Sequence, residues 1–452
     1  MDSSSNPNPE APSAPSTTIP HLRDALTDLT AHPYPVVPNP PELNNKKRAS
    51  VALIIRIQPH YAHWPTADFV QERSQQPPKS PEQRLTEFFD QDWVQHGDPE
   101  ILYIKRTTRL GDKWAGHIAF PGGRRDPEDA DDQAAAVRET WEEVGLELSN
   151  SICIPTGNLP QRVVSARWGR LPLMVLCPYV FLITSPDLPP LRLQPTEVAS
   201  AHFVSIRALS SPALRTYEYQ DVSGRLWGNA GVSRWMIRNI LGDMIFAAIR
   251  LHPSESIHCN SIDGFIPEGP PQHELSLFGK MSTWWHSKTT AQKALAEQKN
   301  LHLWGLTLGI TADFLDLLPP HNSLRLWIYP TFTPWDVQLW IRLWTYMFRR
   351  QRRAELTKGY HQASLASDAE STADLAPGAL PTSVQGEGLG VSRYYARAIQ
   401  EKTGTRSMAI DGWIGGYYSL LQKGMATALL TRFGVVVVVV FVASKKYRNT
   451  FR

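Results

Sequence analysis

Three glutamates stand close together in the segment of this chain whose residue types best support chemistry. Glu139, Glu142 and Glu143 lie in residues 131–144, DDQAAAVRETWEEV, where alanine and glutamate predict a helix that Gly145 ends. On a helix, spacings of three and four residues put all three carboxylates on one face, where like charges repel. Mg²⁺ and Mn²⁺ prefer hard oxygen ligands and would remove this repulsion. The pattern therefore predicts a metal site on the helix.

Residues before the glutamates add two further features. Arg138 can pair with a carboxylate and hold its orientation. Pro121–Gly122–Gly123 is a turn whose glycines lack Cβ, so its backbone can approach an anionic ligand or point the Gly123 carbonyl at a metal. Taken alone, the glycine turn and the acidic helix also fit an ordinary turn followed by a solvated helix. The occurrence of both at this spacing favours a metal site instead.

This combination resembles the signature of the Nudix hydrolases. In that family a glycine and a spacer with an acid precede Arg-Glu-aliphatic-x-Glu-Glu-x-Gly-aliphatic; here Gly123 begins the signature and residues 138–146, RETWEEVGL, complete it. Thr140 occupies the aliphatic position, and the spacer is one residue longer than the common form. Asp129 and Asp131 therefore both remain open as the upstream acid.

The resemblance covers about residues 48–320 and implies a fold and a reaction. The fold is of α+β or α/β class, a Nudix-type mixed β-sheet sandwiched between helices. The reaction is hydrolysis of a diphosphate with Mg²⁺ or Mn²⁺, which neutralise charge and lower the pKa of the attacking water. Glu197 is a further candidate base or metal contact, unless it simply begins an edge strand. The implied catalytic residues are Arg138, Glu139, Glu142, Glu143 and Glu197, and the implied metal ligands are Gly123, Glu139, Glu142 and Glu143.

Two further strings resemble the Nudix branch that hydrolyses coenzyme A. They are the spacer GGRRDPEDADD and WGLT at residues 304–307. That branch also has an arginine-rich segment before FPGG, resembled here by residues 104–109 and 116–120, although Asp112 replaces one expected arginine. The implied substrate contacts are Arg106, Arg109, Lys113, His117, Phe120 and Gly122.

The implied substrate is coenzyme A or acyl-coenzyme A, cleaved to 3′,5′-ADP and 4′-phosphopantetheine or its acyl derivative. Another nucleotide diphosphate derivative, such as a dinucleotide or nucleotide sugar, is the alternative within the enzyme class. A Nudix-fold binding or regulatory protein without turnover is the alternative outside it. The three helix glutamates favour an enzyme, because a pure binder has no need of them.

Hydrophobic patterning predicts the elements that must position these residues. Strands are expected at residues 51–57, 101–105, 117–120, 146–148, 171–184 and 197–206, and helices at 81–95, 131–144 and 305–318. Residues 207–260 and 266–300 are interpreted as insertions. The predicted domains are a disordered Pro/Ser-rich tail (1–46), the hydrolase domain (47–322), a Trp-rich segment with a basic end (323–353), a flexible linker (354–392) and a C-terminal helical segment (393–452).

Composition limits the remaining function classes. The 452 residues are 42% hydrophobic, which supports a folded core, and the net charge of +3 creates no global field that would attract nucleic acid. Three cysteines, Cys153, Cys177 and Cys259, form no disulfide framework and favour an intracellular, reducing compartment. The oligomeric state is left open.

The C-terminal segment has two interpretations. Residues 425–443 are 19 residues with one charge, Arg432, followed by a basic flank, which predicts a membrane span close to the end of the chain. Such a tail anchor would hold the enzyme on an organelle membrane facing the cytosol, with the Trp-rich residues 324–348 at the same interface. Alternatively, the six valines at 435–440 form a buried strand.

Overall fold

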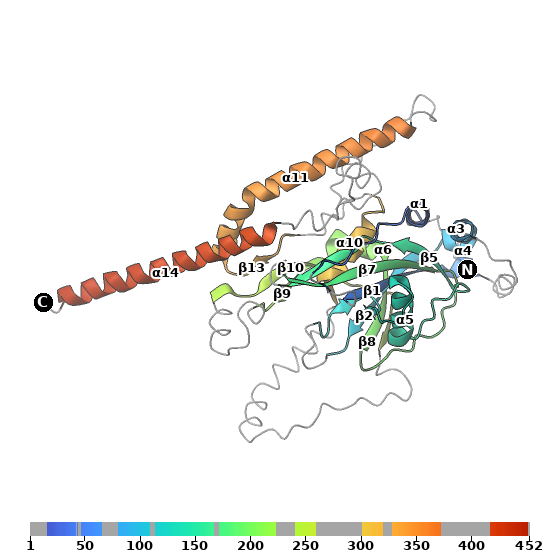
Figure 1. The fold of residues 1–452 in the computed structure, drawn as a ribbon, viewed down its shortest axis with the longest axis horizontal. Helices are drawn as coiled ribbons and strands as arrows, with labels where there is room; N and C mark the ends of the chain where they lie inside the picture. The colour runs from blue at the N-terminus through green and yellow to red at the C-terminus, as the bar shows by residue number, and fades with distance from the viewer. Residues whose placement is uncertain are drawn as a thin grey trace, which may run out of the picture.

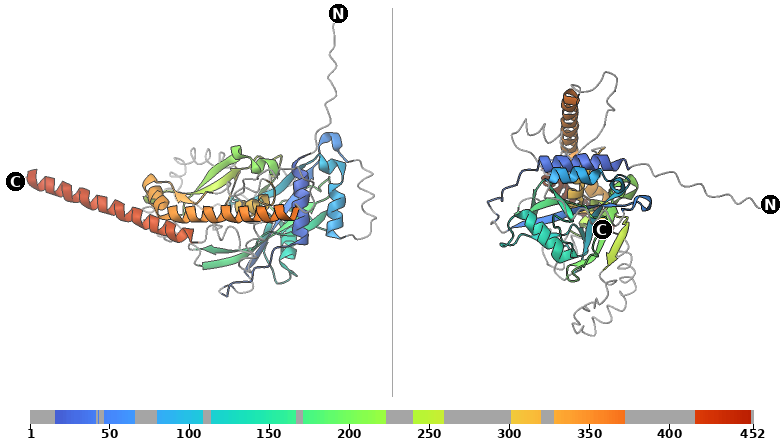
Figure 2. Two further views of the ribbon diagram at one scale, coloured as in Figure 1. Left: turned by 90° about the horizontal axis from the view of Figure 1, so that it is seen from above. Right: turned by 90° about the vertical axis from the view of Figure 1, so that its right-hand side faces the viewer.

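The computed structural model describes residues 16–41, 43, 47–65, 80–108, 114–166, 171–222, 240–258, 301–319, 328–371 and 416–450. Two β-sheets and their covering helices form the body, from which two long helices extend (Figures 1 and 2). The helices are α1 (Thr18–Ala31), α3 (Pro81–Phe89), α4 (Asp92–Gln95), α5 (Asp132–Val144), α6 (Ile206–Ser210), α10 (Gly305–Leu315), α11 (Trp335–Ser371) and α14 (Tyr417–Thr450), with short turns η1 (Tyr61–His63) and η3 (Pro212–Leu214).

The strands form a larger mixed sheet and a smaller antiparallel one. The larger sheet contains β1 (Arg48–Gln58), β2 (Asp98–Arg106), β3 (Ile118–Ala119), β4 (Gly122–Arg124), β5 (Cys153–Asn158), β6 (Arg162–Ala166), β7 (Leu171–Ile183), β8 (Val198–Ser205) and β11 (Glu255–His258). The smaller sheet contains β9 (Arg215–Gln220), β10 (Met244–Arg250), β12 (His302–Trp304) and β13 (Thr331–Phe332).

The central strand of the larger sheet is β1. It pairs in parallel with β7 and antiparallel with β2 and β4, and the order along the sheet is β11-β8-β2-β1-β7-β5. Leu53 and Ile55 point to one face of the sheet, and Ala52 and Ile54 point to the other, so β1 is buried on both sides. This explains its continuous apolar run and confirms the predicted mixed sheet between helices.

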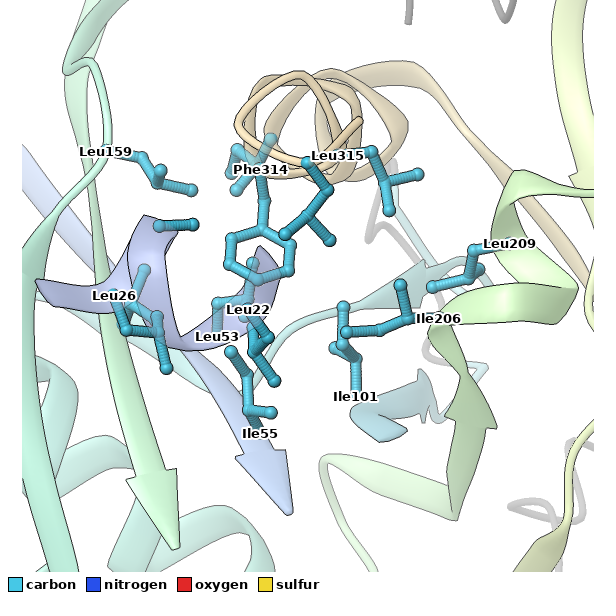
Figure 3. Close-up of a cluster of buried hydrophobic side chains, with 14 of the residues drawn as sticks. Leu22, Leu26, Leu53, Ile55, Ile101, Leu159, Ile206, Leu209, Phe314 and Leu315 are labelled. Atoms are coloured by element: carbon cyan, nitrogen blue, oxygen red, sulfur yellow. The ribbon is translucent and has the colours of Figure 1, made fainter. Parts of the chain in front are cut away.

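The two faces of this sheet carry separate cores. On one face, side chains of α1 and α10 converge on β1, as Figure 3 shows for Leu22, Leu53 and Phe314. On the other face, α5 packs through Ala136 and Val144. The helix that carries the three glutamates therefore lies directly on the centre of the sheet.

The smaller sheet joins α10 to the long C-terminal helices. Antiparallel pairing places β10 between β9 and β12, and β10 also pairs with β13. Met244 and Phe332 of this sheet share a buried cluster with Val337 of α11 and Leu421 of α14. Residues 207–260, expected as an insertion, thus supply strands to both sheets, while residues 266–300 lie outside the described residues.

The N-terminal expectation is corrected over residues 16–41. Helix α1 buries Leu22, Leu26 and Leu29 against the larger sheet. The flanking prolines dominate the composition, but the three- and four-residue spacing of these leucines builds an apolar face that the sheet covers. Residues 1–15 lie outside the described residues.

Other predicted boundaries also differ. Helix α11 continues to Ser371 through the expected linker at 354–392, whose later residues, 372–392, lie outside the described part. The segment predicted as a helix at 81–95 is divided into α3 and α4. Residues 146–148 form no strand: Gly145, at φ 66°, ends α5 and turns the chain, so that Leu146 and Leu148 enter the core without pairing.

Candidate active site

Helix α5 is fixed at both ends. At its start, the Asp131 side chain accepts a hydrogen bond from the Ala134 amide at 2.7 Å, which caps the helix. At its end, Gly145 adopts the left-handed conformation. The helix therefore presents Glu139, Glu142 and Glu143 from a rigid frame.

Glu143 is the most buried of the three glutamates. Its side chain is 2% exposed, and its Oε2 accepts a hydrogen bond from the Gly122 amide at 2.8 Å. The Arg106 Nη1 lies 3.9 Å from its Oε1. Burial raises the pKa of Glu143 to about 8, although the Gly122 bond opposes this shift. Even with Arg106 nearby, such a carboxylate is costly to ionise unless a further cation lies beside it.

Glu139 lies against the glycine turn, where no side chain would fit. A Cβ placed on Gly123 would lie 2.4 Å from the Glu139 carboxylate carbon. Gly122 has a φ of 149°, and a Cβ there would lie 2.2 Å from the Ser50 carbonyl oxygen. Burial also raises the pKa of Glu139, while neighbouring Arg138 lowers it. The sequence motif thus reflects a close approach between β4 and α5.

Arg138 connects the acids around the turn. Its Nε and Nη2 donate to the two Asp129 carboxylate oxygens at 2.9 and 3.0 Å. Its Nη1 donates to Glu139 at 3.1 Å and to Glu142 at 3.0 Å. The Arg138 hydrogen bond lowers the pKa of Asp129. Of the two acids left open by the sequence, Asp129 therefore pairs with the arginine and Asp131 caps the helix.

Glu197 joins this group from another element. It directly precedes β8, and its carbonyl accepts a hydrogen bond from the Thr107 amide at 2.8 Å. Its negative charge contributes to raising the pKa values of both Glu139 and Glu143. Tertiary structure thus brings a fourth carboxylate to the three on α5.

Helix α10 supports the strand that leads into the glycine turn. The Thr307 hydroxyl donates to the Ile118 carbonyl at 3.0 Å, and the Trp304 ring lies 4.7 Å from the His117 ring. One turn further along, the Thr311 and Tyr103 hydroxyls are hydrogen-bonded at 3.0 Å. The WGLT residues therefore act as a structural support for β3.

The expected substrate contacts have different outcomes. Arg106 reaches Glu143, and His117 packs on Trp304. The expectation for Phe120 is corrected: its ring is 2% exposed and stacks on Tyr103 at 5.0 Å, so it belongs to the core. Gly122 is another expected substrate contact, and its amide donates a hydrogen bond to Glu143. Arg109 and Lys113 lie outside the described residues.

An ion pair that the sequence did not indicate holds the start of α5. Arg48 at the beginning of β1 pairs with Asp132 at 2.7 Å, and both side chains are less than a tenth exposed. Arg48 also donates to Gln161 at 2.8 Å. No local motif links residues 84 positions apart, so only the sheet register reveals this contact.

A second group of metal-type ligands lies elsewhere, formed by His63, Asp92 and His96. His63 Nδ1 is 2.7 Å from Asp92 Oδ2, and the two imidazole rings stack 3.8 Å apart with 2° between their planes. The in-plane lone pairs of parallel rings do not converge on one ion. The hard oxygen donors at α5 fit Mg²⁺ or Mn²⁺ better, because three clustered glutamates and a glycine carbonyl match the preference of these ions.

Comparison with known proteins agrees with this geometry. The family model for the NUDIX domain matches residues 93–222. Protein C14C4.10c of Schizosaccharomyces pombe, described as uncharacterized, is 29% identical over 254 residues, which are 56% of this chain and 67% of that protein.

Two coenzyme A diphosphatases of Mus musculus match over shorter stretches. The mitochondrial enzyme NUDT8 is 48% identical over 52 residues, 12% of this chain and 25% of NUDT8. The peroxisomal enzyme NUDT7 is 54% identical over 46 residues, 10% of this chain and 19% of NUDT7. The chain thus spans a quarter or less of these two relatives. The region that matches the NUDIX domain thus contains the glutamate helix and the glycine turn on which it is seated, and the chain resembles the coenzyme A diphosphatases over short stretches.

Proposed function

We propose that this protein hydrolyses a diphosphate bond in a nucleotide-linked substrate, using Mg²⁺ or Mn²⁺. The observation that supports this most directly is the gathering of Glu139, Glu142, Glu143 and Glu197 beside the glycine turn. Burial and repulsion from neighbouring carboxylates disfavour the ionised forms of Glu139 and Glu143, and a divalent cation would reverse this.

The chain's own residues have distinct parts in the proposed reaction. Glu139, Glu142, Glu143 and the Gly123 carbonyl would hold the cation, which supplies charge neutralisation and a more acidic bound water. Arg138 fixes the directions of Glu139 and Glu142, and the Gly122 amide fixes Glu143. Glu197, or a glutamate left without metal, accepts the proton of the attacking water. The water oxygen forms a bond to one phosphorus of the diphosphate. At the same time the bond between that phosphorus and the bridging oxygen breaks, and the bridging oxygen leaves with the other phosphate.

The substrate that we propose is coenzyme A or acyl-coenzyme A. The products would be 3′,5′-ADP and 4′-phosphopantetheine or its acyl derivative. The similarity to NUDT8 and NUDT7 supports this choice, as do the resemblances of the spacer and of residues 304–307 to that branch. Arg106, beside Glu143, provides positive charge close to the proposed diphosphate site.

A substrate panel tests the proposal. Purified full-length protein with Mg²⁺ or Mn²⁺ is given coenzyme A, acyl-coenzyme A, dinucleotides and nucleotide sugars, and products are identified by mass. We expect coenzyme A compounds to turn over fastest and to yield 3′,5′-ADP. Faster turnover of another nucleotide diphosphate would reject the substrate but retain the reaction. No turnover of any member would favour a binding or regulatory protein.

We also propose that α14 is a tail anchor that keeps the hydrolase domain on the cytosolic side of an organelle membrane. Among the described residues, α14 is the helix long and apolar enough to cross a membrane. Val435–Val440 are helical and exposed, which rules out the alternative of a buried strand. Full-length protein should remain with membranes through carbonate extraction, and a chain truncated after Ser392 should not. Release of the full-length chain by carbonate would reject the anchor.

A further inference from the structure

The first half of α14 is docked on the protein body. It runs antiparallel to α11, and Figures 1 and 2 show the remainder projecting past the start of α11. Gly424 lies so close to α11 that a Cβ there would be 2.9 Å from the Ile341 Cα. The docked face has the one-sided apolar stripe typical of protein packing. Its buried residues are Tyr417, Leu421, Met425 and Ala428.

Polar contacts mark the end of the docked part. The Arg432 guanidinium donates to both carboxylate oxygens of Asp336 at 2.6 Å, and it also donates to the Ile240 carbonyl. One turn earlier, the Trp344 indole donates to the Thr427 hydroxyl at 3.0 Å. The two-point Arg432–Asp336 pair fixes both position and direction of α14.

After Arg432 the helix changes character. The side chains of Val435–Val442 are each between 49% and 62% exposed, so no single face is covered. A helix that is apolar on every side does not match a protein groove, which would cover only one side. Lipid hydrocarbon is the partner that surrounds such a helix completely.

The free apolar part is too short to cross a bilayer. Phe433–Ala443 are 11 residues, about 16 Å as a helix, whereas a bilayer core of about 30 Å needs about 20 residues. If the docked helix entered end-on, Lys445 and Lys446 would be carried into the bilayer interior, where charges are costly. Adding residues 425–432 gives 19 residues, or about 28 Å, with Arg432 as the one charge that the span has to accommodate instead of the two lysines.

We infer that α11 and a lipid bilayer compete for the same face of α14. The docked helix is then a non-spanning state, and residues 425–443 cross a membrane only after they leave α11. This inference rests on the proposed tail anchor. Undocking would separate Arg432 from Asp336 and uncover Val337 and Ile341, which are buried on α11.

The uncovered α11 would suit the membrane interface. Even with α14 docked, α11 exposes large apolar and aromatic groups, and Arg349 and Arg350 follow them. Tryptophan and tyrosine favour the headgroup region, and basic residues favour anionic headgroups. The exposed residues are Trp335, Leu339, Leu343, Trp344, Tyr346 and Met347.

A reversible cross-link tests the competition. The double variant Ile341→Cys/Gly424→Cys joins α11 to α14 where Gly424 packs against Ile341, and each single variant controls for the Cβ that crowds this contact. Full-length protein with a C-terminal epitope is mixed with sealed phosphatidylcholine vesicles containing phosphatidylserine. Protection of the epitope from external protease reports spanning. We expect protection for the reduced double variant, several-fold loss after oxidation, and recovery with dithiothreitol.

A second variant tests the same idea without new cysteines. Asp336→Asn removes the carboxylate partner of Arg432 and should raise the protected fraction several-fold, whereas Asp187→Asn, at an exposed acid elsewhere, should not. If oxidised and reduced double variants are protected equally, the competition is wrong but the anchor stands. If the epitope stays unprotected in wild type, in the reduced double cysteine variant and in Asp336→Asn, the anchor proposal fails and the inference fails with it.

Discussion

At the scale of single residues, Glu143 combines burial with contact to the glycine turn. Glu143→Gln keeps the shape of the side chain but removes a charged oxygen ligand, so we expect kcat to fall by about 10²–10³ while the fold is retained. Steady-state kinetics at saturating Mg²⁺, with circular dichroism as a check on folding, measures this. The exposed Glu147, just after α5, offers the matched control Glu147→Gln. Near-full activity of Glu143→Gln would contradict the proposed ligand set.

The raised pKa of Glu143 also predicts a pH dependence of stability without metal. The folded protein holds the proton up to about pH 8, whereas the unfolded chain loses it near the ordinary value of 4.5. The folded state therefore binds more protons between these values, and the free energy of unfolding should fall as pH rises through that window. Urea unfolding with EDTA measures the slope. Glu143→Gln should flatten it; an unchanged slope would assign the effect to other groups.

Gly123 shows how one residue type permits the approach of two elements. Gly123→Ala would place a Cβ against the Glu139 carboxylate and displace it, and a displacement of about 1 Å can cost about 10² in rate. Kinetics as a function of Mg²⁺ concentration should show a lower kcat and a weaker metal dependence. Gly434→Ala is the control, because nothing lies within 4 Å of a Cβ there. Equal activity of both variants would refute this account of the turn.

At the scale of elements, α10 supports β3 through Thr307. Thr307→Val keeps the shape but removes the donor to the Ile118 carbonyl, which should lower the free energy of unfolding by about 1 kcal/mol. Because β3 leads into the glycine turn, kcat should also decrease. Thr307→Ser retains the hydroxyl and should restore both quantities, as measured by urea unfolding and steady-state kinetics. Failure of serine to restore kcat would indicate a packing role alone.

At the scale of the whole molecule, the catalytic group and α14 lie on separate parts of the structure. The helix that carries the glutamates, α5, packs on β1, β4 and β8, whereas α14 packs on α11 and shares a buried cluster with the smaller sheet. A chain truncated after Ser392 should therefore retain turnover, while the uncovered Val337 and Ile341 should promote self-association. Activity measurements and light scattering test both parts. Loss of turnover in a folded, monomeric truncated chain would instead link α14 to catalysis.

The sequence by itself determined the helix of α5, its glutamate face and the central strands, because these depend on local spacing. Arg138 and its three following glutamates lie within one and a half helical turns, so their relation needs no tertiary contact. For the run of six valines the sequence allowed two interpretations, a buried strand and a membrane-spanning helix. β-branched residues are frequent in strands, and they also occur in apolar helices.

Tertiary structure decided what depends on distant partners. Glu197 reaches the site only because β8 pairs with β2, and Asp132 finds Arg48 only through the packing of α5 on β1. Likewise, the leucines of α1 order a proline-flanked segment because the sheet offers a surface for them. Arg432 appears as an isolated charge within an apolar stretch until the antiparallel contact with α11 places Asp336 beside it. Contacts of this kind join positions far apart in the chain, so no local pattern encodes them.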